Sequence, residues 1–327
     1  MKASIKIIAE QSGVSKTTVS FVLNGRGDEK NISADTQKRV LDTALRLNYQ
    51  PNHLARSLST GRSYTIGFVV PDISNPFFSR IARLVEHYAE EKGYSVMMAS
   101  TDEKPEKEQK IINSFHNRQI DGVIIAPSSV DMIKNTPNFP FVTFDRQMPN
   151  FRTANITINN EESAYQLTQK LFERGCNRVG VVTLKAFLPN IKQRIDGYKK
   201  ALQDNKLITD MELIVEANIN DIRATIKSGI DTLMNLSRPV NGIFFLNNVL
   251  ATEGIWVFNR YYPQLLDKVL FASFDNIDVF DYVQPKVISA LQPGEEIARN
   301  CVNMLIAQIE GKNLQEAICL STTIIER

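Results

Sequence analysis

The sequence predicts a small all-α head followed by an α/β body with parallel sheets. Three observations lead to this prediction. Residues 1–49 contain short segments with helical periodicity, each preceded by a serine that can cap a helix. From residue 63 onward, apolar runs such as YTIGFVV alternate with helical segments of roughly 12–18 residues. These runs lack the alternation of polar and apolar residues typical of half-exposed strands, which favours strands covered by helices on both faces.

The size and charge of the chain agree with two or three domains. The 327 residues are 43% hydrophobic, which is enough for a substantial core. The net charge is only +2, but residues 1–62 carry +5 and the remainder carries −3. A basic head on a slightly acidic body indicates that one end of the chain meets a polyanion.

The cysteines and the hydropathy pattern indicate a reducing compartment and no membrane partner. Cys176, Cys301 and Cys319 form no CxxC pair, and we expect small buried hydrophobes rather than disulfides. The N-terminus has no apolar run of signal-peptide length, and no window approaches the ~18 apolar residues of a membrane span. We therefore expect a cytoplasmic protein.

The first two predicted helices of the head form a pair joined by a tight turn. Ser4 is the expected N-cap of Ile5–Gln11, and Ser15 is the expected N-cap of Lys16–Leu23. The dipeptide Asn24-Gly25 ends the second helix. Two short helices across such a turn form a helix-turn-helix, which occurs both in DNA-binding heads and in ordinary helical hairpins.

A third helix and a linker complete the predicted front of the chain. The helix spans Thr36–Leu47, and Ser33 can cap it. Its expected core residues are Val40, Leu41, Ala44 and Leu47. Residues 50–62 contain Pro51 and few core-forming side chains, so we expect a linker.

Two strings give the chain a family resemblance. The second helix reads VSKTTVSFVLNG, and the linker reads NYQPNHLARSL. With the α/β body, they resemble the LacI/GalR family of bacterial transcription regulators, and the likeness covers essentially the whole chain. The resemblance implies a helix-turn-helix domain at 1–49, a hinge helix at 50–62 and an effector-binding and dimerisation domain at 63–327. It also implies a repressor of sugar-utilisation genes whose operator affinity an effector changes.

For the body, the resemblance implies a periplasmic sugar-binding-protein fold with two doubly wound subdomains. We place the three crossovers between them near Asn159–Glu161, Leu291–Pro293 and Leu320–Thr322. Ligands of doubly wound sheets bind at the carboxyl ends of the strands, where polar and aromatic residues gather in this sequence. The N-subdomain is then about 63–160 and 293–320, and the C-subdomain is about 161–291 and 321–327.

For the head, the resemblance implies that the second helix enters the major groove with its N-terminal, solvent-facing residues. Lys16 can donate to guanine or phosphate, and Thr17 can contact a base edge or a thymine methyl. Phe21 stands where relatives often carry Arg or His; it either contacts thymine methyls or packs. Leu58 would enter a minor-groove base step as a wedge. The predicted DNA-binding residues are Ser15, Lys16, Thr17, Thr18, Ser20, Phe21, Asn24, Asn52, His53, Arg56 and Leu58.

The effector pocket implied by the resemblance is closest to a ribose-type pocket. Aromatic rings can cover the C–H faces of a sugar, carboxylates can accept its hydroxyl donors and guanidinium groups can donate to its oxygens. One departure is Asn248, where many relatives have Asp. The predicted effector-binding residues are Asn75, Phe77, Phe78, Asp145, Arg146, Arg194, Asn247, Asp275 and Gln292.

The predicted partners are double-stranded operator DNA, a monosaccharide and a second copy of the chain. A two-fold homodimer would bind a pseudo-palindromic operator. Trp256, Phe280 and Tyr282 are candidate dimer contacts by the resemblance, with core packing as the alternative. The effector could act either as an inducer or as a co-repressor.

Alternatives remain open for the effector and for the class of protein. Lys185, Lys192 and Arg194 lie near the predicted pocket mouth and leave a sugar phosphate open, as well as a non-sugar effector. The body alone would fit a sugar-binding transport or sensor protein. No GxGxxG or GxxxxGK[ST] string follows a strand, and the three histidines have no metal-ligand spacing. We therefore expect no enzyme activity, no cofactor and no metal.

Overall fold

The computed structural model of the protein describes residues 4–49, 61–128, 139–147, 153–184, 188–207, 210–312 and 316–327. The chain divides into a head, Met1–Ser63, and a body, Tyr64–Arg327. Among the described residues, no helix is long and apolar enough to cross a membrane.

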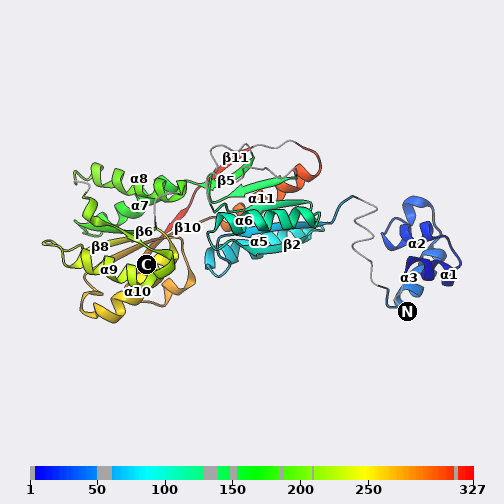
Figure 1. Ribbon diagram of the computed structural model, residues 1–327, viewed down its shortest axis with the longest axis horizontal. Helices are drawn as coiled ribbons and strands as arrows, with labels where there is room; N and C mark the ends of the chain where they lie inside the picture. The colour runs from blue at the N-terminus through cyan, green and yellow to red at the C-terminus, as the bar shows by residue number, and fades with distance from the viewer. Residues whose placement is uncertain are drawn as a thin grey trace. The chain divides into compact units, whose positions relative to one another are not determined.

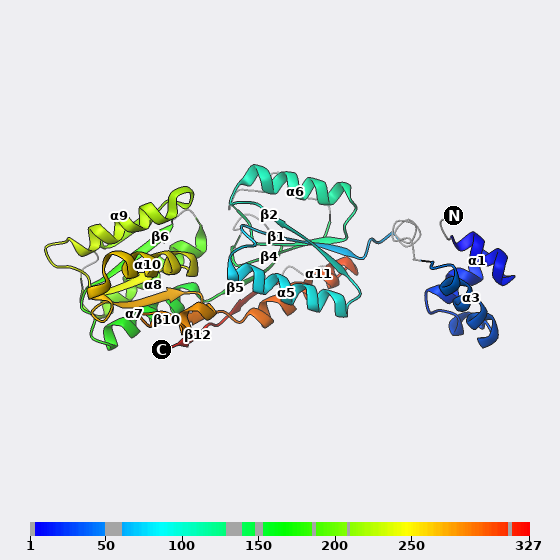
Figure 2. The same cartoon turned by 90° about the horizontal axis from the view of Figure 1, so that it is seen from below.

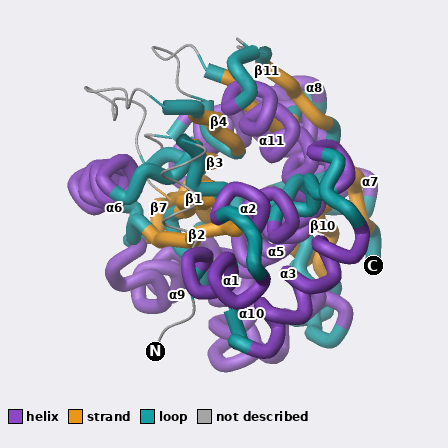
Figure 3. Tube along the Cα trace, turned by 90° about the vertical axis from the view of Figure 1, so that its right-hand side faces the viewer, coloured by secondary structure: helices purple, strands orange, loops and turns teal. Residues whose placement is uncertain are grey.

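The described part of the head is helical (Figure 3). Its elements are α1 (Ile5–Ser12), α2 (Lys16–Leu23), the 3-10 helix η1 (Asp28–Lys30) and α3 (Ala34–Arg46). Each α-helix begins after a serine whose hydroxyl oxygen accepts a backbone N–H of the first turn. The pairs are Ser4 with Ile7, Ser15 with Thr18 and Ser33 with Thr36. The three predicted caps are confirmed.

A small apolar core holds the three helices of the head together. It consists of Ile8, Ala9, Val19, Val22, Val40 and Ala44. The prediction that Leu41 is buried is wrong, because 49% of this residue is exposed. Leu41 follows Val40 directly, and one residue turns a helix by about 100°, so the two side chains cannot share one narrow face. On α2, Val19 and Val22 face this core, while Lys16 and Thr17 are exposed to solvent.

The first sheet of the body has the strand order β11-β5-β4-β3-β1-β2, and all of its pairs are parallel. Helices α5 and α11 cover one face and α6 covers the other (Figure 2). The bounds are β1 (Thr65–Val70), α5 (Pro76–Glu91), β2 (Ser95–Ser100), α6 (Pro105–Asn117), β3 (Gly122–Ile125), β4 (Phe141–Phe144), β5 (Ala154–Ile158), α11 (Gly294–Ile309) and β11 (Ala317–Leu320).

The second sheet has the order β12-β10-β9-β8-β6-β7 and is parallel except for its antiparallel edge strand β12. Helices α7 and α8 cover one face, and α9 and α10 cover the other (Figures 1 and 2). The bounds are α7 (Asn160–Glu173), β6 (Val179–Leu184), α8 (Pro189–Asp204), η2 (Met211–Leu213), β7 (Ile214–Ala217), η3 (Ile219–Asp221), α9 (Ile222–Met234), β8 (Gly242–Phe245), α10 (Asn248–Tyr261), η4 (Pro263–Leu265), β9 (Leu270–Phe274), η5 (Asp278–Asp281), β10 (Val287–Leu291) and β12 (Thr323–Ile325).

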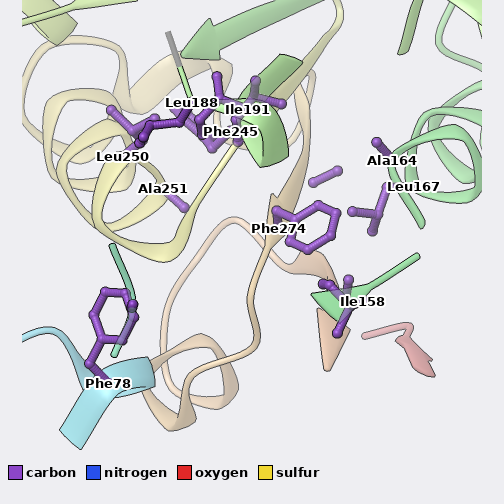
Figure 4. Close-up of a cluster of buried hydrophobic side chains, with 14 of the residues drawn as sticks. Phe78, Ile158, Ala164, Leu167, Leu188, Ile191, Phe245, Leu250, Ala251 and Phe274 are labelled. Atoms are coloured by element: carbon purple, nitrogen blue, oxygen red, sulfur yellow. The ribbon is translucent and has the colours of Figure 1, made fainter. Parts of the chain in front are cut away.

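Burial explains why the strand segments are apolar without alternation. Every residue of β3, β4 and β8 is buried, because helices cover both faces of each sheet. Around the second sheet, Leu188 and Ile191 at the start of α8 and Phe245 and Phe274 on the strands belong to the buried cluster drawn in Figure 4. Both predicted parallel sheets are therefore confirmed, and β12 adds one antiparallel edge.

The chain passes between the two sheets three times. We call the part around the first sheet the first lobe and the part around the second sheet the second lobe. The passages lie at Asn159, at Gln292–Pro293 and at Ser321–Thr322. Asn159 joins the first and third passages, because its Oδ1 accepts the N–H of Thr322 at 3.1 Å and its own N–H donates to Leu320 O at 2.9 Å.

One carboxyl group is buried at the carboxyl edge of the first sheet. Glu108 on α6 is 0% exposed, and its Oε2 accepts the N–H of Ser128 at 2.7 Å. Its Oε1 has no hydrogen-bond partner in the described part of the chain. Burial raises the pKa of Glu108 to about 7, although Ser128 and Arg146 favour the charged form.

We predict that Glu108→Gln changes the pH dependence of stability. The pKa of Glu108 is higher in the folded than in the unfolded protein. At a pH between these two pKa values, the carboxyl group is protonated in the folded protein and ionised in the unfolded one. The free energy of unfolding therefore falls by up to about 3 kcal/mol as the pH rises from about 4.5 to about 7. Glutamine does not titrate, so the variant lacks this loss.

Urea unfolding at about pH 5 and about pH 7.5 measures this difference. Glu108→Gln should gain stability relative to the parent protein at the higher pH. The matched control is Glu106→Gln, an exposed carboxylate on the same helix, which should follow the parent. Equal pH dependence in all three proteins would contradict the assignment.

Candidate functional site

The start of α2 presents a polar surface. Lys16 and Thr17 are exposed, while Val19 and Val22 on the opposite side of the helix are buried in the head core. Ser15 caps the helix through Thr18, and the two hydroxyl oxygens are 2.9 Å apart. Lys16 and Thr17 are therefore positioned by a fixed first turn and can reach a partner outside the head.

At the end of α2, the predicted DNA-binding residues Asn24 and Phe21 contact residues that are near them in the chain. Asn24 donates from Nδ2 to Ser20 O at 2.7 Å, which closes the helix. Phe21 is half-buried, with Arg26 at 5.8 Å and Lys30 at 5.4 Å from its ring centroid. These two cations follow α2 in the chain and were not predicted; an aromatic ring with nearby basic residues was the available signal. A contact of Phe21 with thymine stays a prediction.

Part of the predicted set lies outside the described residues. These are the linker residues Asn52, His53, Arg56 and Leu58 and the basic residue Lys185. Lys192 is described and is exposed on α8.

In the body, residues of both lobes line two cavities at the carboxyl ends of the strands. One cavity, of about 360 Å³, is lined by the predicted residues Phe77, Asp275 and Gln292. The other, of about 410 Å³, is lined by Asp145 together with Asn190 of the second lobe. We call the region that contains both cavities the cleft. It lies where ligands of doubly wound sheets bind.

Hydrogen bonds cross the cleft at two places. Asn190 on α8 donates from Nδ2 to both carboxylate oxygens of Asp145, at 3.3 and 3.4 Å. Asn248 on α10 donates from Nδ2 to Oδ1 of Asn75 at 3.0 Å. Polar side chains of the first lobe are thus bound to polar side chains of the second.

Asp145 and Asp275 occupy equivalent places in the two lobes. Each is the first residue after a strand, β4 or β9, and each has a positive φ, 64° and 69° respectively. Non-glycine residues rarely adopt this conformation, which carries strain that the surrounding structure must support. Both residues are buried, at 8% and 6% exposure, so their carboxylates depend on neighbouring donors.

Asp275 takes its donors from a lobe passage and from a helix start. Gln292 donates from Nε2 to Oδ1 at 2.5 Å, and the backbone N–H of Asn248 also donates. Burial raises the pKa of Asp275, while the charge of Arg194 and these hydrogen bonds oppose the rise. Gln292 thus connects a cleft carboxylate to the chain segment that joins the lobes.

Two buried amide oxygens lack a donor within the described residues, Asn248 Oδ1 and Gln292 Oε1. Their orientation is fixed, because each amide nitrogen faces an oxygen that accepts. A buried acceptor without a donor costs about 1–3 kcal/mol. Gln292 also lines the first cavity, so a hydroxyl group there could satisfy its oxygen.

Arg146 is held by an acidic partner that was not predicted. Its Nη1 and Nη2 donate to the two carboxylate oxygens of Glu103 at 2.8 and 2.7 Å, and Nη1 also donates to Pro127 O at 2.8 Å. Burial lowers the pKa of Arg146, but Glu103 outweighs this and the net shift is upward. The available signal was the acidic turn DEK directly after β2, at the edge where the site lies.

Arg194 is almost fully buried, at 3% exposure. Its Nε donates to Asn160 Oδ1 at 2.8 Å, and its Nη1 donates to Leu246 O at 2.7 Å. The guanidinium carbon lies 3.6 Å from the ring centroid of Phe274. Burial lowers its pKa, and Asp275 and Asp145 oppose this. The residue stabilises the second lobe beside the cleft.

The remaining predicted effector residues have structural contacts of their own. Phe78 is buried and packs edge-on against Phe144, with ring centroids 6.3 Å apart. Phe77 is half-buried, 5.0 Å from the ring of Phe78, and lines the first cavity. Asn247 caps α10 by accepting the N–H of Leu250 at 2.8 Å. Their contact with an effector stays a prediction.

One candidate dimer contact is wrong. Phe280 is 0% exposed and belongs to the body core, because η5 turns it inward beneath Arg327. Trp256 and Tyr282 are exposed, at 41% and 86%. Arg223 lies over the Trp256 ring at 4.4 Å. These two aromatic residues remain candidates for contact with a second copy.

The contacts of the cleft are those of a binding site. Its buried groups are carboxylates and amides with fixed donors and acceptors. Among the described residues, no cluster of three or more His, Cys, Asp or Glu could hold a metal ion. Such a surface can hold a molecule that offers several hydrogen-bond donors.

Comparisons with known proteins agree with this geometry. Residues 4–52 match the lacI family of bacterial regulatory proteins, and residues 66–313 match the periplasmic binding protein domain. The repressor PurR of Aliivibrio fischeri (strain MJ11) is 27% identical over 97% of this chain and 94% of its own length. The ribose operon repressor of Halalkalibacterium halodurans is 29% identical, over 95% of this chain and 92% of its own.

A solved structure shares the fold. The structure of the lac repressor dimer bound to operator and the anti-inducer ONPF has a TM-score of 0.87 against this chain. It is 17% identical and covers 100% of this chain and 98% of its own. With a head that matches one family and a body that matches the other, the chain belongs to the LacI family of bacterial regulatory proteins and carries a periplasmic binding protein domain.

Proposed function

We propose that this regulator represses transcription as a homodimer on a pseudo-palindromic operator, and that a monosaccharide bound in the cleft changes its operator affinity. The observation that carries the proposal is the pair of hydrogen bonds across the cleft, Asp145 with Asn190 and Asn75 with Asn248. A ligand that binds these groups binds both lobes at once. The named relatives are repressors, and one is a ribose operon repressor.

The head supports the DNA part of the proposal. Lys16 and Thr17 are exposed on the first turn of α2, and Ser15 fixes that turn. A recognition helix reads base edges with its N-terminal residues, and two such helices related by a two-fold axis require half-sites about one helical turn apart. Lys16 and Thr17 are therefore proposed to contact bases.

The cleft supports the sugar part. Asp145, Asp275 and Gln292 line its cavities and offer oxygen acceptors to hydroxyl donors. Phe77 lines the same cavity as Asp275 and Gln292 and can cover an apolar face of a sugar ring. The buried Gln292 Oε1 has no donor within the described residues, and a sugar hydroxyl can supply one.

The response to the effector is proposed to act through the lobe passages. Gln292 belongs to one passage and holds Asp275 in the cleft. Asn159 joins the other two passages, so they move together. A ligand that favours one arrangement of the lobes then changes operator affinity by a coupling free energy of about 1–3 kcal/mol. The coupling is reciprocal, so operator DNA changes the affinity for the sugar by the same factor.

Selection from random duplex DNA tests the operator part. The purified protein should enrich one pseudo-palindromic sequence, and Thr17→Ala should weaken binding to that sequence about tenfold while relaxing the choice of one base per half-site. Binding to unrelated DNA should stay within about twofold, because phosphate contacts dominate there.

The matched control is Thr36→Ala on α3, whose hydroxyl bonds to Ser33. It should retain the parent's sequence preference. Failure of the parent to enrich any sequence would favour a sugar-binding sensor without a DNA target.

Titration of the selected duplex with and without D-ribose tests the effector part. We predict that Asp275→Asn loses at least about half of any coupling, because a carboxylate that accepts two hydroxyl donors becomes an amide with one acceptor oxygen. Asp278→Asn, at the edge of the same cavity, is the control and should respond like the parent. An undiminished response of Asp275→Asn would place the effector elsewhere.

A further inference from the structure

Resting on the proposed function of the cleft, we infer that its effector is an uncharged, hydroxyl-rich sugar and that the cleft excludes the phosphate ester of the same sugar. The protein's own oxygen atoms occupy several groups at the cleft that would otherwise bind a phosphate. These are the guanidinium groups of Arg146 and Arg194 and the N-termini of α5, α8 and α10.

Glu103 occupies the guanidinium group of Arg146. Both terminal nitrogens of Arg146 donate to the Glu103 carboxylate at 2.7 and 2.8 Å, and Nη1 donates in addition to Pro127 O. End-on bidentate recognition of phosphate would use the same two nitrogens, and the remaining Nε lies 3.5 Å from Asp145 Oδ2. A phosphate at Arg146 would have to displace a half-buried, hydrogen-bonded carboxylate and would then lie beside its negative charge.

Arg194 is closed to phosphate in a different way. Two of its nitrogens donate to Asn160 and to the carbonyl oxygen of Leu246. One face of the guanidinium lies on the Phe274 ring. The carboxylates of Asp145 and Asp275 already balance its charge.

The N-termini of α5, α8 and α10 at the cleft are also closed. Those of α7 and α11 have no side-chain cap, but the first turn of each carries two glutamates, which oppose an anion. A helix N-terminus binds anions through its free N–H groups. Pro76 and Pro189 occupy the first positions of α5 and α8 and have no N–H to offer. In each of the helices α5, α8 and α10, an asparagine side chain accepts a backbone N–H of the first turn. These pairs are Asn75 with Phe77, Asn190 with Ile191 and Asn247 with Leu250.

The charges around the cavities oppose a phosphate as well. The second cavity is lined by Asp145, Glu161 and Glu162, and no Lys or Arg lines it among the residues that the structure describes. The first cavity is lined by Arg80 and Arg83, both exposed, and by the acidic residues Asp275 and Asp278. Exposed arginines are solvated and hold an anion weakly.

Matched pairs of ligands test the inference. The full-length protein is melted with D-ribose, D-xylulose, D-glucose and D-fructose, and with the 5- or 6-phosphate of each sugar. We expect at least one free sugar to raise the melting temperature, and its phosphate ester to bind at least about tenfold more weakly. A phosphate ester that binds as tightly as its free sugar, or more tightly, would overturn the inference and leave a sugar-responsive regulator. Silence with all eight ligands would contradict the proposed function itself.

A second experiment tests the role of Glu103 without any sugar. Inorganic phosphate should not stabilise the parent protein beyond the effect of an equal ionic strength of chloride. Glu103→Ala exposes the Arg146 guanidinium to the cleft and should gain a phosphate-dependent rise in melting temperature. If Glu103→Ala does not fold, Glu103→Gln removes the charge and keeps the shape, and it should gain a smaller rise.

Glu106→Ala is the matched control, because it removes one exposed carboxylate three residues further along the chain, on the first turn of α6, without touching Arg146. It should show no gain. Equal rises in melting temperature in the Glu103 and Glu106 variants would show that the phosphate effect arises from net charge alone. That result would overturn the assignment to Arg146. A phosphate response already present in the parent and lost in Arg80→Ala would overturn the inference as well.

Discussion

Buried carboxylates at the ends of the strands require donors, and this requirement joins the two lobes. Asp145 receives donors from Asn190 on the opposite lobe, and Asp275 receives them from Gln292 in a lobe passage. An unpaired buried charge would cost several kcal/mol, so each carboxylate fixes the side chains around it. The arrangement of the cleft and the orientation of its amides depend on this pairing.

The fold was predictable because burial determines sequence pattern. Fully covered strands such as β3 and β8 read as uninterrupted apolar runs, and Ser4, Ser15 and Ser33 mark helix starts by their chemistry. The edge strand β12 was missed, because three residues are too short to show a period. Leu41 was wrongly expected in the core, and Phe280 was left open between a dimer contact and the core, since a side chain's direction depends on tertiary packing that local spacing does not specify.

The residues of the cleft were predictable from their position after strands, but their partners were not. Asp145, Asp275 and Gln292 line the cavities. Glu103, Asn160 and Asn190 became visible only when the lobes brought separate segments together. Arg146 shows the consequence most clearly, since its residue type suggests a ligand contact while its two terminal nitrogens are bound to Glu103. Residue type identifies a candidate, and only the hydrogen-bond partners show what it still offers.

The most direct test of the account is a crystal structure of the protein with D-ribose. The central claim is that the effector completes the hydrogen bonding of the buried polar groups in the cleft. The account predicts a ribose hydroxyl that donates to Gln292 Oε1 and another that donates to the Asp275 carboxylate, each at about 2.7–3.0 Å. Ribose bound away from both groups, or bound in the cleft with Gln292 Oε1 still without a donor, would contradict it.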